Sequence, residues 1–279
     1  MKKINIVTII GETNAGKSTL VNALVGQKVS IVSRKVQTTI FNIMGIITEG
    51  DTQVAIIDTP GFYRSKSANN YEKVAWGAFR KTELILFVID GSKKNLEKSK
   101  KLIQKIDENK HVVLVINKVD LVRKPDLLKL IGEFSSLRNF EHVFLVSSVE
   151  NLSGVGDLRK YLLDNAEPGE WLFAEDDTTD QSMEVYAAEI TREHIYDLLH
   201  KEIPYSCSVK TISIEPREDG VGWKIMQDII ISKESHKSII LGKGGCKIKT
   251  IGESARKELQ RLMECPIQLF LTVKVEKKF

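Results

Sequence analysis

Short apolar segments alternate with amphipathic segments over the first 166 residues of the chain. The apolar segments are rich in β-branched residues and span 4–10, 53–58, 84–90, 112–117 and 143–147. The stretches with helical spacing between them are 18–26, 96–109, 125–137 and 155–164. Strands that are apolar on both faces are typical of a parallel sheet covered by helices. We therefore expect residues 1–166 to form an α/β domain with a doubly wound, mostly parallel sheet.

The pattern changes after residue 166. Residues 167–183 are rich in acidic and turn-forming residues, which predicts an exposed linker. The elements expected beyond the linker are a helix near 189–202, strands at 209–215 and 223–232, a short helix at 235–241, an amphipathic helix at 246–263 and a strand at 267–275. This αββααβ order describes a small three-stranded α+β domain over residues 184–279.

The composition favours a cytoplasmic protein with two domains. The chain has 279 residues, of which 42% are hydrophobic, enough for two packed cores. Its longest uninterrupted apolar run, 84–89, is much shorter than the ~20 residues of a membrane-spanning helix. The basic, then apolar start lacks the cleavage region of a secretory signal. The three cysteines form no C-x-x-C pair, which argues against a disulfide framework or a zinc ribbon.

The segment GETNAGKS at 11–18 fits the phosphate-loop pattern G-x-x-x-x-G-K-[ST] between a predicted strand and a predicted helix. Its backbone N–H groups and the helix N-terminus suit phosphate, Lys17 can reach the β- and γ-phosphates, and Ser18 can ligate Mg²⁺. Asp58 ends a buried strand in the segment DTPG, where its carboxylate can hold the Mg²⁺ shell. The nucleotide-binding residues expected in these two motifs are Gly11, Glu12, Thr13, Asn14, Ala15, Gly16, Lys17, Ser18, Asp58, Thr59, Pro60, Gly61 and Phe62.

Two later motifs indicate that the base is guanine. The segment NKVD (Asn117, Lys118, Val119 and Asp120) follows the strand at 112–117 and resembles the guanine-specificity motif N-K-x-D. The Asp120 carboxylate can accept hydrogen bonds from N1–H and the exocyclic amine of guanine, whereas adenine would leave this carboxylate unpaired. The segment SSV (Ser147, Ser148 and Val149) also follows a strand and can donate a backbone N–H to guanine O6. We therefore expect GTP and GDP rather than adenine nucleotides.

The position that orients the attacking water in many GTPases holds Phe62, which cannot polarise water. Intrinsic turnover should therefore be slow. Arg34 and Arg64 are candidate internal arginine fingers, although solvated loop positions explain them better. Asn14 leaves two hypotheses of equal weight: it either helps to bind a K⁺ ion that assists hydrolysis, as in related GTPases with asparagine there, or only stabilises the loop.

An acidic stretch precedes a basic window at 233–261, which holds 8 basic and 3 acidic residues. At its centre, GKGG fits the G-x-x-G loop with which KH domains clamp a nucleic-acid backbone. Most of the isoleucines beside the loop are expected to be core, and Trp223 is expected to pack rather than stack on a base. The residues expected to bind RNA are Lys237, Gly242, Lys243, Gly244, Gly245, Lys247 and Lys249.

Together, these motifs resemble the Era family of bacterial ribosome-assembly GTPases over essentially the whole chain. The resemblance includes the segment SRKVQTT at 33–39 and the C-terminal segment SHKSIILGKGGCKIKTIGESAR at 235–256. It implies a GTPase domain followed by a KH type II domain. It also implies that Thr39, or alternatively Thr38, reaches Mg²⁺ together with Ser18 and Asp58, and that Lys17, Thr39 and Gly61 are catalytic. The chain departs from the usual family pattern at Glu12 and Thr13, which replace an Arg-Pro pair, and at Ser148, which replaces an alanine.

The partners that this resemblance implies are the 3′ end of 16S-type small-subunit rRNA, the 30S subunit and a peripheral contact with the inner membrane. We expect a monomer. Two other functions stay open at this point: a GTP-dependent scaffold with negligible hydrolysis, which Phe62 makes conceivable, and a P-loop phosphotransferase that acts on a small molecule. Strong ATP binding would favour the phosphotransferase.

Overall fold

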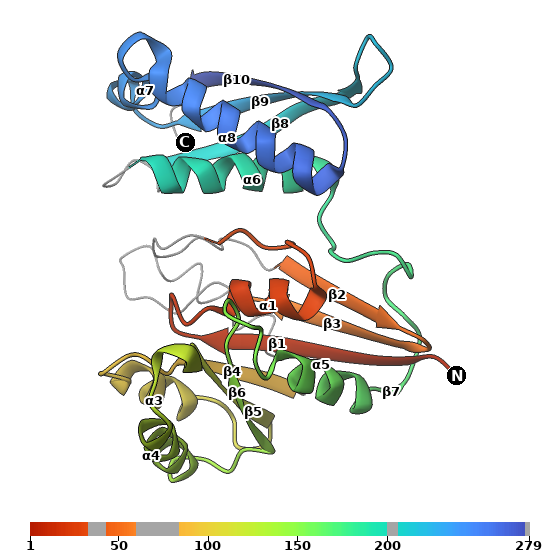
Figure 1. Ribbon diagram of the computed structural model, residues 1–279, viewed down its shortest axis with the longest axis vertical. Helices are drawn as coiled ribbons and strands as arrows, with labels where there is room; N and C mark the ends of the chain where they lie inside the picture. Colours follow the sequence, from red (N-terminus) through yellow and green to blue (C-terminus); the bar gives the residue numbers. More distant parts are fainter. Residues whose placement is uncertain (33–42, 60–83, 200–205, 277–279) are drawn as a thin grey trace. The chain divides into compact units, whose positions relative to one another are not determined.

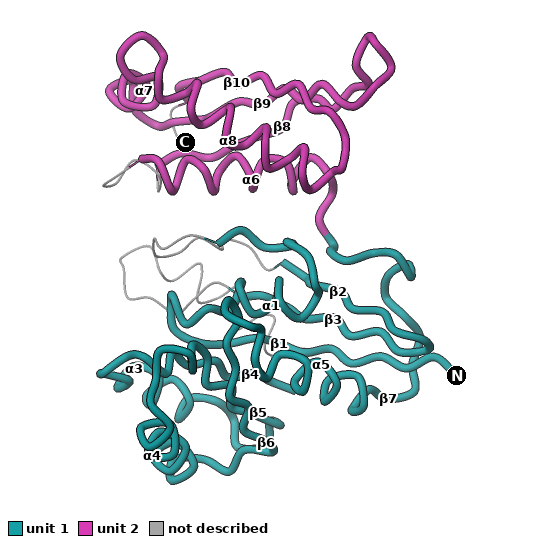
Figure 2. Tube along the Cα trace, viewed as in Figure 1, with its two compact units in different colours: residues 1–32, 39–180 teal, residues 33–38, 181–279 magenta. Residues whose placement is uncertain are grey.

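The computed structural model describes residues 1–32, 43–59, 84–199 and 206–276. The described residues up to Asp180 form one compact unit and those from Gln181 form a second, as Figure 2 shows. Five expected or candidate site residues lie outside the described ranges: Thr38, Thr39, Pro60, Gly61 and Phe62. The candidate arginines Arg34 and Arg64 also lie outside them.

The N-terminal unit is built on one sheet with the strand order β2-β3-β1-β4-β5-β6 (Figure 1). Strands β1, β3, β4, β5 and β6 are parallel, as the apolar runs predicted, and β2 pairs with β3 in the antiparallel sense. The strands are β1 (Lys3–Gly11), β2 (Ile43–Glu49), β3 (Thr52–Asp58), β4 (Leu84–Asp90), β5 (His111–Asn117), β6 (His142–Val146) and the short β7 (Glu167–Pro168), which pairs with β1. Strand β2 was not predicted; its apolar pattern is interrupted by Gly45.

Helices cover both faces of this sheet, so the expected doubly wound α/β fold is confirmed. Helices α1 (Lys17–Val25) and α5 (Val155–Asp164) pack with Val7, Ile9 and their neighbours on one face. Helices α3 (Glu97–Ile103) and α4 (Lys124–Ser135) enclose a second apolar core on the other face, which includes Phe87 and Phe134. Helix α3 is shorter than the 96–109 that the pattern predicted, because turns follow Ile103.

The parallel arrangement brings the carboxyl ends of four strands to one edge of the sheet. In the strand register, Ile9 of β1 lies beside Asp58 of β3, and Asp90 of β4 lies beside Asn117 of β5. Because loops that leave this edge are adjacent, the phosphate loop, Asp58 and Thr59 of the DTPG motif, and the NKVD motif meet there.

Residues 167–180, part of the segment 167–183 that the sequence predicted as an exposed linker, hydrogen-bond to the sheet of the N-terminal unit. We call residues 171–180 the strap. The backbone N–H of Ile46 donates to the Thr178 carbonyl at 2.9 Å, and the N–H of Met44 donates to the Asp180 carboxylate at 2.9 Å. A β-bridge between Gly45 and Thr179 lies between these two contacts. The strap therefore extends the sheet beyond β2.

The other end of the strap is held by Gln53, a fully buried residue of β3. Its Oε1 accepts the backbone N–H groups of Leu172 at 3.0 Å and Phe173 at 3.1 Å, and its Nε2 donates to the Phe173 carbonyl at 3.1 Å. Trp171 donates its indole N–H to the Asp51 carbonyl at 3.2 Å. The acidic composition of the segment did not predict this attachment, because the attachment depends on one buried glutamine that lies about 120 residues away in the sequence.

The C-terminal unit has the αββααβ order that the sequence predicted. Its three strands lie in the order β10-β9-β8, with β8 antiparallel and β10 parallel to β9. Its elements are α6 (Met183–Leu198), β8 (Cys207–Pro216), β9 (Trp223–Ile231), α7 (Glu234–Leu241), α8 (Cys246–Met263) and β10 (Ile267–Val275). Helix α6 starts earlier than expected because the Ser182 side chain caps it by accepting the N–H of Val185.

Apolar side chains from the helices and the sheet form one core in this unit. Ile240 and Ile251 are fully buried in it, as expected for the isoleucines beside the GKGG loop, whereas Ile239 is exposed. Trp223 is also partly exposed. The loop GKGG is therefore carried by two helices, α7 and α8, that are anchored in the core.

Candidate nucleotide and RNA sites

The phosphate loop runs from β1 into α1 and lies directly against the neighbouring strands. A Cβ on Gly11 would lie 2.2 Å from the Val88 carbonyl oxygen, so the close approach of the loop to β4 requires glycine. Gly16 has a φ of 89°, and a Cβ there would lie 2.3 Å from Nδ2 of Asn117. The two glycines of the motif thus let the loop turn tightly above β4 and β5.

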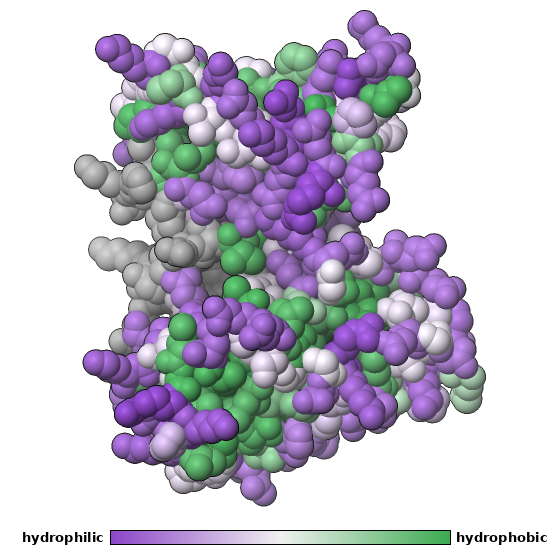
Figure 3. Space-filling model, viewed as in Figure 1, coloured by the Kyte–Doolittle hydropathy of each residue, from purple (hydrophilic) through white to green (hydrophobic). Residues whose placement is uncertain are grey.

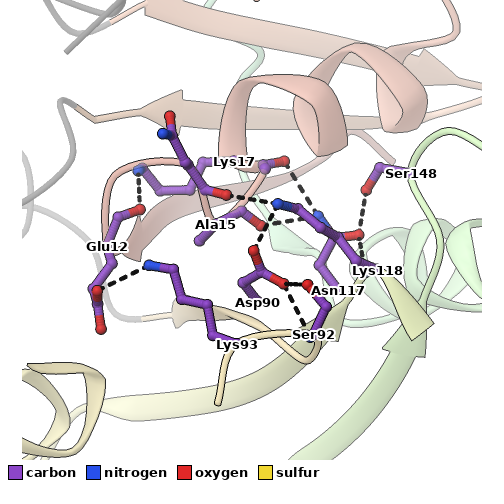
Figure 4. Close-up of polar contacts among 11 residues, drawn as sticks. Glu12, Ala15, Lys17, Asp90, Ser92, Lys93, Asn117, Lys118 and Ser148 are labelled. Atoms are coloured by element: carbon purple, nitrogen blue, oxygen red, sulfur yellow. Dashed lines mark hydrogen bonds and ion pairs between the residues drawn. The ribbon is translucent and has the colours of Figure 1, made fainter. Parts of the chain in front are cut away.

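Lys17, the first residue of α1, is only 7% exposed. Its ammonium donates a hydrogen bond to the Glu12 carbonyl at 3.1 Å, so the side chain curls back over the loop (Figure 4). Burial lowers the pKa of Lys17 to about 8, although the nearby Asp58 carboxylate acts in the opposite direction. An anionic ligand in the loop would replace the solvation that this ammonium has lost.

Asp58 lies at the end of β3 and is completely buried. Among the described residues, neither of its carboxylate oxygens has a hydrogen-bond partner within normal geometry. Burial raises its pKa; Lys17 and the hydroxyls of Ser18 and Ser30 partly offset this effect. A buried carboxylate with free oxygens beside a serine hydroxyl is a donor set that fits Mg²⁺, which prefers oxygen ligands and retains phosphate or water in the rest of its shell.

Asn117, at the end of β5, links the three loops of the site. Its Nδ2 donates to the Ala15 carbonyl at 3.0 Å. Its Oδ1 accepts the backbone N–H of Lys118 at 2.8 Å and the hydroxyl of Ser148 at 2.9 Å. Ser148, which stands where the family usually has alanine, therefore contributes a hydrogen bond that braces the predicted guanine loops.

The Lys118 side chain extends across the phosphate loop. Its ammonium donates to the Asn14 carbonyl at 2.9 Å and to Oδ2 of Asp90 at 2.6 Å (Figure 4). Asp90 also accepts from the backbone N–H and the hydroxyl of Ser92, at 3.0 and 2.6 Å. Asp90 was not predicted from the sequence, although it is an acidic residue at the end of a buried apolar run, as Asp58 is.

Asp120 and the SSV segment lie around the predicted base position. Asp120 is exposed, in the short helix Val119–Leu121, and Val149 is 77% exposed. The Ser147 backbone N–H donates to the Ser153 carbonyl at 2.9 Å. An N–H for guanine O6 would therefore come from Ser148 or Val149.

The Glu12 side chain turns away from Lys17 and towards the segment between β4 and α3 (Figure 4). Its carboxylate binds the ammonium of Lys93 at 3.1 Å and the hydroxyl of Ser99 at 2.5 Å. Glu12 therefore contacts the Lys17 ammonium through its backbone carbonyl, and its carboxylate binds Lys93 and Ser99 instead. Lys93 and Ser99 were not predicted to contact the loop, because nothing in their spacing along the sequence marks them as its neighbours.

The GKGG loop of the C-terminal unit is open to ligand. A Cβ on Gly244 or Gly245 would meet no atom within 4 Å, and both residues have positive φ values. Lys243, Lys247 and Lys249 are exposed beside them, and Lys237 is partly exposed on α7. The visible face of this unit over α8 is predominantly hydrophilic (Figure 3).

A pocket of about 300 Å³ lies between α8 and β10, next to the GKGG loop in sequence. Its lining includes apolar side chains from both elements and two basic side chains from α8. Its lining residues are Ile248, Lys249, Gly252, Glu253, Arg256, Leu269 and Leu271. Of these residues, only Lys249 was predicted from the sequence to bind RNA; the strand predicted at 267–275 did not indicate that Leu269 and Leu271 line a pocket.

Comparison with known proteins identifies the two units. Residues 6–118 match a family described as 50S ribosome-binding GTPase, and residues 202–278 match the KH domain family. The chain is 44% identical to GTPase Era of Brucella suis, over 98% of this chain and 88% of that protein. The chain belongs to the Era family of GTPases. A second Era relative, from Rhizobium meliloti, is 43% identical over the same shares of the two chains.

Solved Era structures have the same fold over the full chain. Aquifex aeolicus Era with the substitution Y63A, bound to GDP·AlF₄⁻, has a TM-score of 0.91 and 33% identity, covering 99% of this chain and 95% of its own. An Era complex with MgGDPNP and nucleotides 1506–1542 of 16S ribosomal RNA also has a TM-score of 0.91, with 34% identity and coverages of 100% and 95%. The predicted family, the KH domain and GTPase activity are thus confirmed.

None of the helices in the described part of the chain combines the length and the apolar character that a bilayer span needs.

The Era family relationship favours a GTPase over the small-molecule phosphotransferase that the sequence left open.

The buried charges of the nucleotide site should cost stability in the nucleotide-free protein. The double variant Lys17→Met/Asp58→Asn replaces both groups with neutral side chains of similar size. We expect it to raise the free energy of unfolding in urea by about 1–4 kcal/mol without nucleotide, because a poorly satisfied buried pair costs more in desolvation than it returns. The same variant should lose Mg²⁺-dependent GTP binding.

A charge-matched control is Lys160→Met/Asp164→Asn on the exposed face of α5. This control should change the unfolding free energy by less than about 0.5 kcal/mol and leave GTP binding intact. A Lys17/Asp58 variant that is less stable than the wild type would contradict the account of the site.

Proposed function

We propose that this chain is a GTP-hydrolysing switch that binds the 3′ end of small-subunit rRNA through its KH domain and assists 30S subunit assembly. The observation that carries the nucleotide part is that two charged residues, Lys17 and Asp58, are buried at the sheet edge from which the phosphate loop and the NKVD motif leave. The Era relative solved with MgGDPNP and 16S rRNA supports the RNA part.

In this proposal, the backbone of residues 11–18 surrounds the phosphates and Lys17 neutralises the β- and γ-phosphates. Ser18, Thr39 and Asp58 would hold Mg²⁺, which supplies charge neutralisation at the phosphates. Gly61 would approach the γ-phosphate, and Phe62 leaves the water without a side chain that can polarise it, so turnover without a partner is slow.

Specificity for guanine would come from Asp120, whose exposed carboxylate can accept two hydrogen bonds from the base. Asn117 holds the loops in place through Ala15 and Ser148. The Lys118 side chain would cover the base while its ammonium stays fixed by Asp90 and the Asn14 carbonyl.

RNA binding would use the GKGG loop and the pocket between α8 and β10 together. The loop brings backbone and lysine charges to the phosphates, while Leu269 and Leu271 offer an apolar surface for unstacked bases. Lys249 and Arg256 flank this surface. Binding should depend on salt because the lysine contacts are to phosphates.

The chain itself offers a route from nucleotide state to the RNA-binding unit. Residues 33–42, which contain the predicted switch threonines, lead directly into β2. Strand β2 in turn hydrogen-bonds the strap, which continues into α6 of the C-terminal unit. A conformational change in the segment before β2 would therefore reach the strap directly through the hydrogen bonds between β2 and the strap.

The RNA proposal predicts tighter, sequence-selective binding in the GTP form. Titration of a short RNA copying the small-subunit rRNA 3′ end, against a scrambled RNA, should give a higher affinity with a non-hydrolysable GTP analogue than with GDP. The variant Lys243→Ala/Lys247→Ala should weaken binding about tenfold and reduce the salt dependence, since each lysine that contacts a phosphate contributes to both.

The control Lys160→Ala removes an exposed lysine of the N-terminal unit and should leave RNA affinity unchanged. Equal, weak binding of both RNAs in both nucleotide states would overturn the RNA part. Rapid GTP binding with no measurable hydrolysis would favour the scaffold function instead.

A K⁺ requirement through Asn14 is a separate prediction. If Asn14 helps to hold a K⁺ ion near the phosphates, GTP turnover should be several-fold faster in KCl than in NaCl of equal ionic strength. The variant Asn14→Ala should remove this difference. Equal rates in the two salts would show that Asn14 only stabilises the loop, where its backbone carbonyl accepts from Lys118.

The monomeric state and a peripheral inner-membrane contact stay predictions.

A further inference from the structure

An acidic side chain in the phosphate loop needs a physical explanation. Glu12 is only 8% exposed, so water screens its carboxylate poorly. A carboxylate so close to bound phosphates would repel them unless a cation neutralised it. Its environment shows how the chain manages this charge.

Two side chains from the segment that follows β4 bind the Glu12 carboxylate. Oε2 accepts from the Lys93 ammonium at 3.1 Å, and Oε1 accepts from the Ser99 hydroxyl at 2.5 Å. Ser99 is 1% exposed on α3, and Lys93 keeps about a third of its side chain in solvent. The carboxylate is thus held at both oxygens and paired with one positive charge.

The same residue also places the phosphate-binding lysine. The Glu12 carbonyl accepts the Lys17 ammonium at 3.1 Å and the Ala15 N–H at 3.3 Å. Among the charged groups around Lys17, Lys93 lowers its pKa and Glu12 raises it, so both charges act on the ammonium although burial dominates. The clamp at the side chain therefore fixes the backbone group to which Lys17 is bound.

We infer that Glu12 is a positioning residue that ties the phosphate loop to the β4–α3 segment, and that Lys93 neutralises it so that the loop accepts an anionic nucleotide. This inference rests on the proposed nucleotide site. It assigns to Lys93 and Ser99 a role in GTP and GDP affinity although neither belongs to a nucleotide-binding motif.

The test is the affinity of the full-length protein for fluorescent GDP and a fluorescent non-hydrolysable GTP analogue. Lys93→Met leaves the Glu12 carboxylate buried without its cation and should weaken both nucleotides about tenfold. Adding Glu12→Gln removes the repelling charge, so the double variant should return to within about threefold of the wild type. Lys93→Arg should bind like the wild type.

Lys94→Met is the matched control, because it removes a neighbouring, exposed lysine from the same loop. It should leave the affinities unchanged, and circular dichroism should show that all variants are folded. Rescue by the second substitution separates charge neutralisation from a structural role, since a structural role would make the double variant as weak as the single variant or weaker.

Two results would overturn the inference: an affinity of Lys93→Met equal to that of Lys94→Met, or a double variant that binds no better than Lys93→Met. Lys17→Met distinguishes these failures from failure of the proposed site. If Lys17→Met loses nucleotide binding, the site stands and only the role of Glu12 and Lys93 falls. If Lys17→Met binds like the wild type, the proposed nucleotide site itself is wrong.

Discussion

The nucleotide site depends on two opposite charges that the fold buries at one edge of its sheet. Lys17 has lost most of its solvation, and the Asp58 oxygens have no partners among the described residues. Burial therefore lowers the pKa of Lys17 and raises the pKa of Asp58, which favours the neutral form of each group. An active site of this kind exchanges stability of the free protein for affinity, because the ligand and its Mg²⁺ restore the interactions that burial removed. The sheet and both cores hold these two groups in place before any ligand arrives.

The end of β4, the turn that follows it and the start of α3 brace both sides of this site. Asp90 fixes Lys118 on the side of the predicted base, while Lys93 and Ser99 fix Glu12 on the side of the phosphates. Both attachments reach the phosphate loop, since Lys118 also binds the Asn14 carbonyl. A loop of eight residues is therefore held from two sides by a segment that carries no nucleotide-binding motif of its own.

Local patterns predicted the parallel strands, the αββααβ unit and the positions of the motifs, because strand burial, helix spacing and loop chemistry are properties of neighbouring residues. Contacts between distant residues were not predictable in this way. Glu12 and Ser99 are 87 residues apart, and the attachment of the strap depends on Gln53, 120 residues from Phe173. The acidic composition of 167–183 predicted an exposed linker, and nothing in it indicated that the backbone of the strap would extend the sheet. The early start of α6 depended on a single capping serine.

In the proposed function, the nucleotide state reaches the RNA-binding unit through β2 and the strap. Hydrogen–deuterium exchange, measured on the full chain with GDP and with a non-hydrolysable GTP analogue, tests this most directly. We expect the backbone amides of β2 and of residues 171–180 to exchange at different rates in the two states, as those of the phosphate loop do. Differences confined to the phosphate loop and the predicted switch segments, with identical exchange in β2 and the strap, would contradict it.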